Sequence, residues 1–191
     1  PSGLINFKLE KKIINQIIKP TLKAINEIGE KYKGFLYAGL MIKNNNPYLI
    51  EYNVRMGDPE CQTILPLLKS DLLDIIISCC NKSLNEKKIE WYDKKSLCIV
   101  LCSKGYPHKY KKNVEIPNSD NLLEDENNFI FHAGTKLEKK KLYAVGGRVL
   151  NFVSISDNFN LSRNSAIKKI KELDWKKGFY RSDIGYKIIN L

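Results

Sequence analysis

The feature that most constrains the fold is residues 47–55, PYLIEYNVR, which follow an asparagine-rich segment and alternate between apolar and polar residues from Ile50 onward. Aromatic and β-branched residues at this spacing predict a strand, and Asn44 to Pro47 predict the turn before it. Because successive side chains of a strand point to opposite faces, Glu51, Asn53 and Arg55 are expected to share one face. The opposite face, directed into a core, is then formed by Ile50, Tyr52 and Val54.

The shared polar face combines groups that suit a metal ion and a phosphate. The Glu51 carboxylate and the Asn53 amide oxygen are hard ligands for Mg²⁺, which takes one or two protein carboxylates while phosphates and waters complete its shell. The Arg55 guanidinium is suited to holding two phosphate oxygens in a planar fork. The alternative, at this point, is a solvated strand face whose three polar residues coincide by chance.

Arginine is rare in this chain. Of the 32 lysines and arginines only four are arginine, namely Arg55, Arg148, Arg163 and Arg181. Because the two side chains are not interchangeable at bidentate sites, an arginine that persists against a lysine-rich composition suggests that the guanidinium is needed. Arg148 follows Gly146 and Gly147, whereas Arg163, at the start of a predicted helix, has the setting of ordinary surface charge.

Composition limits the classes of protein that this chain can belong to. With 191 residues, 43% of them hydrophobic, it can bury a core as one domain or as two small ones. No apolar run approaches the roughly 18 residues of a membrane span, and the N-terminus lacks the signal-peptide pattern. The five cysteines are odd in number and form no Cys-x-x-Cys pair, which predicts buried reduced thiols in a cytoplasmic protein.

A formal net charge of +11 raises the question of nucleic-acid binding. The lysines are spread along the chain, and the densest clusters, residues 109–112 and 139–141, flank turn-like segments. They lack the aromatic spacing of a stacking platform. A general lysine bias therefore explains the charge, and anionic small molecules would benefit from it. We expect no nucleic-acid partner.

The periodicity predicts an α+β protein rather than a parallel doubly wound sheet. In the first part we expect a helix over 7–33 bent near Pro20, an antiparallel strand pair, a short helix over 59–69 and a second helix, capped by Ser70, to Asn81. The strand pair covers residues 35–42 and 48–54. Polar residues 81–95 predict a boundary between two domains, 1–90 and 91–191. Beyond it we expect strands over 96–103, 129–135 and 142–156, and one helix over 159–173 with Leu161, Ile167 and Ile170 on its buried face.

Several segments together resemble the phosphoribosylamine–glycine ligase family, also called glycinamide ribonucleotide synthetase, which is of the ATP-grasp type. They are residues 34–42, 50–60 (IEYNVRMGDPE), 65–72, 105–107 (GYP), 131–135 (FHAGT), 146–150 (GGRVL) and 179–185 (FYRSDIG). They follow the family's order and approximate spacing over nearly the whole chain. The resemblance implies the C-terminal part of an ATP-grasp domain followed by a small, mainly antiparallel β domain with one helix.

The resemblance also implies an activity. The family joins glycine to 5-phosphoribosylamine through glycyl phosphate, with ATP cleaved to ADP and phosphate, in purine biosynthesis. Glu51 and Asn53 then match the positions that hold Mg²⁺, or Mn²⁺, against the ATP phosphates. Arg55 matches a phosphate-side arginine with a catalytic role and a role in binding ATP.

The resemblance is less definite for the other substrate-binding residues. Asp58 and Glu60 are candidates for the glycine ammonium, although Asp58 before a proline equally suits a turn. Gly146, Gly147 and Arg148 suit an anion-binding turn for the ribose phosphate, the alternative being a hairpin glycine pair. His132 is expected to be a hydrogen-bonded core residue, and Tyr180, Arg181 and Asp183 to fix the C-terminal segment.

The chain is shorter than the family pattern. We find no glycine-rich phosphate loop in it, so we expect a C-terminal portion that needs the enzyme's N-terminal half for catalysis. Two alternatives stay open: a non-catalytic interaction module, and another ATP-grasp carboxylate–amine ligase.

Overall fold

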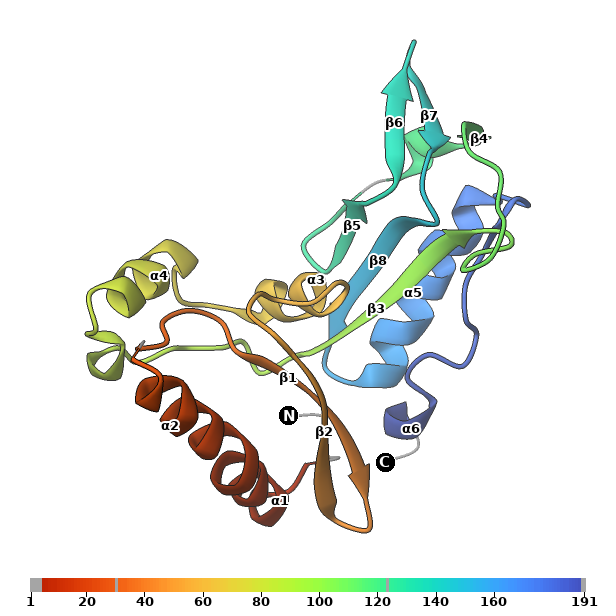
Figure 1. The fold of residues 1–191 in the computed structure, drawn as a ribbon. Coiled ribbons are helices and arrows are strands. Elements are labelled where there is room, and N and C mark those ends of the chain that lie inside the picture. Colours follow the sequence, from red (N-terminus) through yellow and green to blue (C-terminus); the bar gives the residue numbers. More distant parts are fainter. Residues whose placement is uncertain (1–4, 30, 123, 190–191) are drawn as a thin grey trace. The chain divides into compact units, whose positions relative to one another are not determined.

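The computed structural model describes residues 5–29, 31–122 and 124–189, and the chain divides into two compact units (Figure 1). The first unit consists of Pro1–Asp58 and Leu68–Trp91, and the second of Pro59–Leu67 and Tyr92–Leu191. The short segment Pro59–Leu67 thus groups with the second unit. The domain boundary between residues 90 and 91 stays a prediction.

The first unit begins with a long helical region that is interrupted before Pro20. Its segments are α1 (Phe7–Ile13), the π-helical turn η1 (Ile14–Ile18) and α2 (Lys19–Glu27). Proline has no N–H to donate, so the regular bond pattern cannot pass through it, and a π-helical turn is a common way to absorb the defect. The predicted irregularity near Pro20 is confirmed. The helix ends earlier than predicted, shortly before Gly29, whose φ of 102° is incompatible with a helix.

A β-hairpin follows, as predicted. Strand β1 (Tyr37–Lys43) pairs antiparallel with β2 (Asn46–Asn53). The two connecting residues, Asn44 and Asn45, have φ angles of 50° and 56°. A two-residue hairpin turn of type I′ needs positive φ at both positions, and asparagine tolerates that conformation better than most residues.

The expectation that Ile50 and Val54 point into a core is wrong. Their exposed fractions are 65% and 72%. Tyr52, on the same face as Ile50, is half-buried because its hydroxyl lies 2.5 Å from Thr21 Oγ1 of α2 and donates to the Ile17 carbonyl at 3.4 Å. Among the described residues the sheet of β1 and β2 has two strands only, so it covers little apolar surface.

The rest of the first unit contains α4 (Leu72–Cys80) and the 3₁₀ turn η3 (Leu84–Glu86). The predicted cap of α4 is wrong by one residue. Asp71 Oδ1 accepts from the Asp74 backbone N–H at 2.9 Å, which is the bond expected of an N-cap. The Ser70 hydroxyl instead accepts from the Glu90 backbone N–H at 2.8 Å.

The second unit is built around two antiparallel sheets, so the predicted α+β class with antiparallel strands is confirmed. The first sheet has the order β5-β8-β3-β9, and the second the order β4-β7-β6. The strands are β3 (Lys95–Ser103), β4 (Val114–Ile116), β5 (Asn128–His132), β6 (Thr135–Glu138), β7 (Lys141–Ala144), β8 (Arg148–Ser156) and β9 (Gly178–Phe179). The helical segments are α3 (Glu60–Ile64), η2 (Leu65–Leu67), η4 (Ser119–Asn121), α5 (Phe159–Leu173) and α6 (Tyr186–Ile189).

Helix α5 lies along strands β3 and β8, and its bounds match the predicted 159–173 (Figure 1). Its buried residues are Ser162, Ala166, Ile170 and Leu173. The predicted buried face of this helix is wrong at one residue, because Leu161 is 53% exposed. Leu161 stands in the first turn, where its backbone N–H bonds the Asn158 cap at 2.9 Å.

The cysteines follow the prediction only in part. All five are free thiols, but of them only Cys102 is buried, and Cys80 is exposed. Burial raises the pKa of the Cys102 thiol, and the nearby Arg148 charge offsets part of that rise. Within the described residues, no helix is both long and apolar enough to cross a membrane.

The C-terminal segment is held by an arginine that the sequence suggested was ordinary surface charge. Arg163 of α5 donates from Nε to the Ile184 carbonyl at 3.0 Å and from Nη2 to the Ser182 carbonyl. Arg181, which we expected to fix this segment, instead forms a fork with its neighbour Asp183 at 3.0 and 2.7 Å. That fork lowers the pKa of the exposed Asp183 carboxyl.

Replacing Arg163 with methionine should therefore loosen the segment that leads to α6. Two hydrogen bonds to carbonyls are lost, so we expect the free energy of unfolding to fall by about 1–2 kcal/mol. Hydrogen exchange at residues 184–189 should become faster. The matched control is Arg181→Met, which should change neither measurement appreciably. Equal effects of the two variants would contradict the anchoring role of Arg163.

Candidate metal and phosphate site

The two predicted metal ligands lie together at the end of β2. Asn53 Nδ2 donates to Glu51 Oε1 at 3.1 Å, so the expected sharing of one strand face is confirmed for this pair. Glu51 is exposed and Asn53 is half-buried. The amide nitrogen, which cannot bind a cation, faces the carboxylate. A metal ion held by both side chains requires the amide oxygen to take that place.

The opposite strand leaves room for the Glu51 side chain. Gly39 of β1 is paired with Glu51, and a Cβ built on Gly39 would lie 3.0 Å from Glu51 Cγ. The strand register shifts between Gly39 and Leu40, directly beside this pair. The space that a larger residue would fill is therefore open to the carboxylate. With one carboxylate and one amide oxygen on an accessible face, the pair fits a Mg²⁺ or Mn²⁺ that draws its other ligands from phosphate and water.

The described residues hold no cluster of three or more His, Cys, Asp or Glu side chains that would bind a metal by itself. Glu51 and Asn53 therefore leave most of the coordination shell to other ligands, such as phosphate oxygens and water. This is the coordination that Mg²⁺ adopts in phosphate-transferring enzymes.

Arg55 departs from the expected extended segment. Strand β2 ends at Asn53, and Arg55 lies in the bend that follows. Its Nη1 donates to the carbonyl of the adjacent Met56 at 2.9 Å, and the side chain is exposed. The predicted alternation therefore extends over Glu51 and Asn53 but stops before Arg55. This contact uses Nη1, so Nε and Nη2 keep N–H groups with which the guanidinium can bind a ligand.

The remaining predicted residues belong to different parts of the chain. Asp58 is exposed and belongs to the first unit, whereas Glu60 begins α3 of the second unit. A joint site for the glycine ammonium thus stays a prediction. His132 was expected in the core, and this is wrong: the residue is exposed at the end of β5, with Nδ1 2.9 Å from Thr135 Oγ1.

The segment Gly146-Gly147-Arg148 enters β8 through a tightly packed turn. The Gly146 N–H donates to the Gly134 carbonyl at 3.2 Å. Ser103 holds the turn from the other side: its hydroxyl donates to the Gly146 carbonyl and its backbone N–H donates to the Gly147 carbonyl, each at 2.8 Å. A Cβ on Gly147 would lie 2.2 Å from Tyr106 Cδ2. Close packing is a sufficient reason for a glycine at position 147 even if no ligand binds there. This agrees with the alternative given above, a glycine pair that serves only the hairpin. Anion binding here stays a prediction.

The packing role of Gly147 can be measured. We expect Gly147→Ala to lower the free energy of unfolding by about 1–3 kcal/mol because the new methyl group collides with the Tyr106 ring. In a Tyr106→Ala background the same change should cost distinctly less, which urea unfolding of the four proteins would show. An equal loss in both backgrounds would mean that another contact constrains the glycine.

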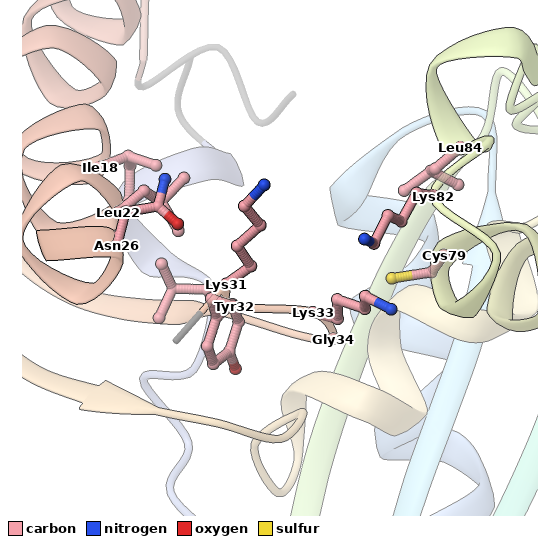
Figure 2. A pocket seen from close by; sticks show the side chains of 11 residues that line it. Ile18, Leu22, Asn26, Lys31, Tyr32, Lys33, Gly34, Cys79, Lys82 and Leu84 are labelled. Carbon is pink, nitrogen blue, oxygen red and sulfur yellow. The ribbon is translucent and has the colours of Figure 1, made fainter. Parts of the chain in front are cut away.

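A cavity of about 500 Å³ in the first unit contains none of the predicted site residues (Figure 2). Figure 2 shows Ile18, Leu22 and Asn26 of the helical region on one side of it, with Cys79 and Lys82 on the other. Lys33, from the segment before β1, also lines it and donates to the Cys80 carbonyl at 3.0 Å. No sequence signal pointed to this cavity, because its lining residues share no motif and come from separate segments of the chain.

Comparison with known proteins identifies two domains of one enzyme family. The domain described as "Phosphoribosylglycinamide synthetase, ATP-grasp (A) domain" matches residues 1–61. The domain described as "Phosphoribosylglycinamide synthetase, C domain" matches residues 96–187. Together the two matches include both groups of predicted site residues.

Individual relatives of this chain point to the same enzyme family. The phosphoribosylamine–glycine ligase of Fusobacterium nucleatum is 46% identical over 97% of this chain and 44% of its own length. The "Trifunctional purine biosynthetic protein adenosine-3" of Gallus gallus is 39% identical over 99% of this chain and 19% of its own length. A crystal structure of phosphoribosylamine–glycine ligase from Thermotoga maritima superposes with a TM-score of 0.80 at 30% identity, over 95% of this chain and 44% of that one. The chain thus spans less than half the length of these relatives.

Proposed function

Because this chain belongs to the phosphoribosylamine–glycine ligase family, we propose that it forms the metal-binding strand and the C-terminal domain of an ATP-dependent ligase of purine biosynthesis. The proposed reaction joins the carboxyl group of glycine to the amine of 5-phosphoribosylamine, with ATP converted to ADP and phosphate. We place the protein in the cytoplasm. Its proposed partners are these small molecules and the N-terminal half of the same enzyme.

The observation that carries this proposal is the pairing of Glu51 and Asn53 on one open face of β2. These two side chains would hold Mg²⁺ or Mn²⁺, which when bound neutralises charge on the ATP phosphates. Arg55, whose Nε and Nη2 are not used in the contact with the Met56 carbonyl, would stabilise the charge on the γ-phosphoryl group as it moves to the glycine carboxylate. The amine of phosphoribosylamine then attacks the glycyl phosphate and displaces phosphate.

The other residues are assigned to substrate binding. Asp58 and Glu60 carry the negative charge that binds a glycine ammonium. In the sequence, both follow closely after the segment that contains Glu51 and Asn53. In the second domain, Arg148 offers a guanidinium suited to the ribose phosphate. Gly146 and Gly147 support it mainly by shaping the turn, since their carbonyls and the Gly146 N–H already bond within the protein.

Metal binding at the strand can be tested on the chain itself. In a titration with Mn²⁺, the amide signals of residues 51–54 should broaden in NMR spectra, and added Mg²⁺ should reverse the effect. Glu51→Gln should weaken Mn²⁺ binding by at least about tenfold because it removes the charged ligand. Asn53→Asp should retain or strengthen it.

The control for this titration is Glu10→Gln, which removes an exposed carboxylate from α1 and should leave the broadening unchanged. Broadening that persists in Glu51→Gln, or that centres on another part of the chain, would contradict the assigned ligands.

The role of Arg55 requires the complete enzyme. We suggest a chimera in which this chain replaces the corresponding 44% of the Fusobacterium nucleatum ligase. The chimera should release ADP only when glycine and phosphoribosylamine are both present. Arg55→Lys should lower kcat by roughly a hundredfold, because lysine cannot hold two phosphate oxygens in a fork.

Arg181→Lys is the matched control, since Arg181 already pairs with Asp183. A folded chimera that uses another carboxylate in place of glycine would indicate a different ATP-grasp ligase. A folded chimera without activity would favour a non-catalytic module.

A further inference from the structure

We propose that a cavity in the second unit binds the phosphate group of a small molecule. The cavity has a volume of about 510 Å³ and is formed by the loop after β3 and the turn after α5. Its chemistry comes from four lysines and two aromatic residues, namely Lys104, Lys109, Lys111, Lys177, Tyr110 and Trp175. None of these residues belongs to the predicted ligase site.

The two walls of the cavity are fixed to each other by the backbone. The Lys104 N–H donates to the Lys177 carbonyl at 2.8 Å, which joins the end of β3 to the turn after α5. Gly105 has a φ of 104°, and a Cβ there would lie 2.3 Å from the Lys109 carbonyl oxygen. The loop therefore folds back tightly, and it brings Lys109 and Lys111 to the same cavity as Lys104.

The positive charge of this cavity is not neutralised from within the protein. In the described part of the chain, no carboxylate lies within ion-pair distance of the four amino groups, whereas the neighbouring Lys176 pairs with Asp174. The four lysines line one cavity and carry like charge, so they repel each other in the absence of an anion. A bound phosphate would relieve that repulsion and accept several charge-assisted hydrogen bonds.

The aromatic residues indicate a ligand with an organic part. Tyr110 packs edge-to-face against Tyr106, with ring centroids 6.1 Å apart, so its ring is held in place at the cavity. Trp175 also lines the cavity, although most of its side chain is buried, and its indole Nε1 has no hydrogen-bond partner among the described residues. A flat or sugar-like group can contact these rings while its phosphate meets the lysines. The ligand class is thus a phosphate ester rather than a purely apolar molecule.

The test is an NMR titration of the chain at low salt, with EDTA present so that metal-dependent binding at Glu51 and Asn53 is excluded. The probes are pyrophosphate, ribose 5-phosphate and AMP. We expect shifts of the amides of residues 104–111 and 175–178 with all three, and tighter binding of the two organic phosphates. Raising the salt concentration should weaken binding, because the lysine side chains are exposed.

Two double variants, each of which removes two lysine charges, distinguish a specific site from a general attraction of anions to the basic chain. Lys104→Gln/Lys177→Gln should weaken AMP binding by about tenfold, since each exposed ion pair contributes roughly threefold. Lys139→Gln/Lys140→Gln, which changes the turn between β6 and β7, should weaken it less than twofold. Equal weakening by both variants, shifts centred elsewhere, or no shifts in the wild-type chain would each overturn the proposal. If pyrophosphate binds as tightly as AMP, the inference that the ligand carries an organic group is overturned.

Discussion

The antiparallel pairing of β1 with β2 is the constraint on which the candidate chemistry depends. It fixes the alternation that places Glu51 and Asn53 on one face, and it sets Gly39 opposite Glu51. A side chain at position 39 would occupy the space that the carboxylate uses. The metal pair is therefore a property of two strands, although both of its ligands come from one.

Sequence periodicity predicted the elements whose signals are local. The bounds of α5 and the hairpin around Asn44 and Asn45 follow from spacing and turn chemistry within a few residues. The short strands β4, β6 and β9 were missed, because strands of two to four residues offer too little alternation to recognise. Burial was also mispredicted at Ile50 and Leu161. Whether an apolar residue is covered depends on neighbours that periodicity does not specify.

The same distinction applies to the functional residues. Glu51 and Asn53 are two positions apart, so their shared face could be predicted, whereas the extension to Arg55 failed because the strand ends at Asn53. The anchoring by Arg163 depends on carbonyls 19 and 21 residues away, and no local pattern reveals it. Likewise, the glycines of the β8 turn looked like an anion site in sequence. Their contacts with Gly134 and Tyr106 give a packing reason for glycine at both positions, and anion binding by the turn stays a prediction.

The two-stranded sheet of the first unit has a further consequence for the behaviour of the protein in solution. Among the described residues neither strand pairs with a third, so each presents an outer row of backbone N–H and C=O groups. Such an edge is a template for strand addition from another polypeptide, and the exposed Met41, Tyr48 and Ile50 side chains add apolar area to it. In concentrated preparations of this chain by itself, intermolecular association and aggregation should start at this hairpin.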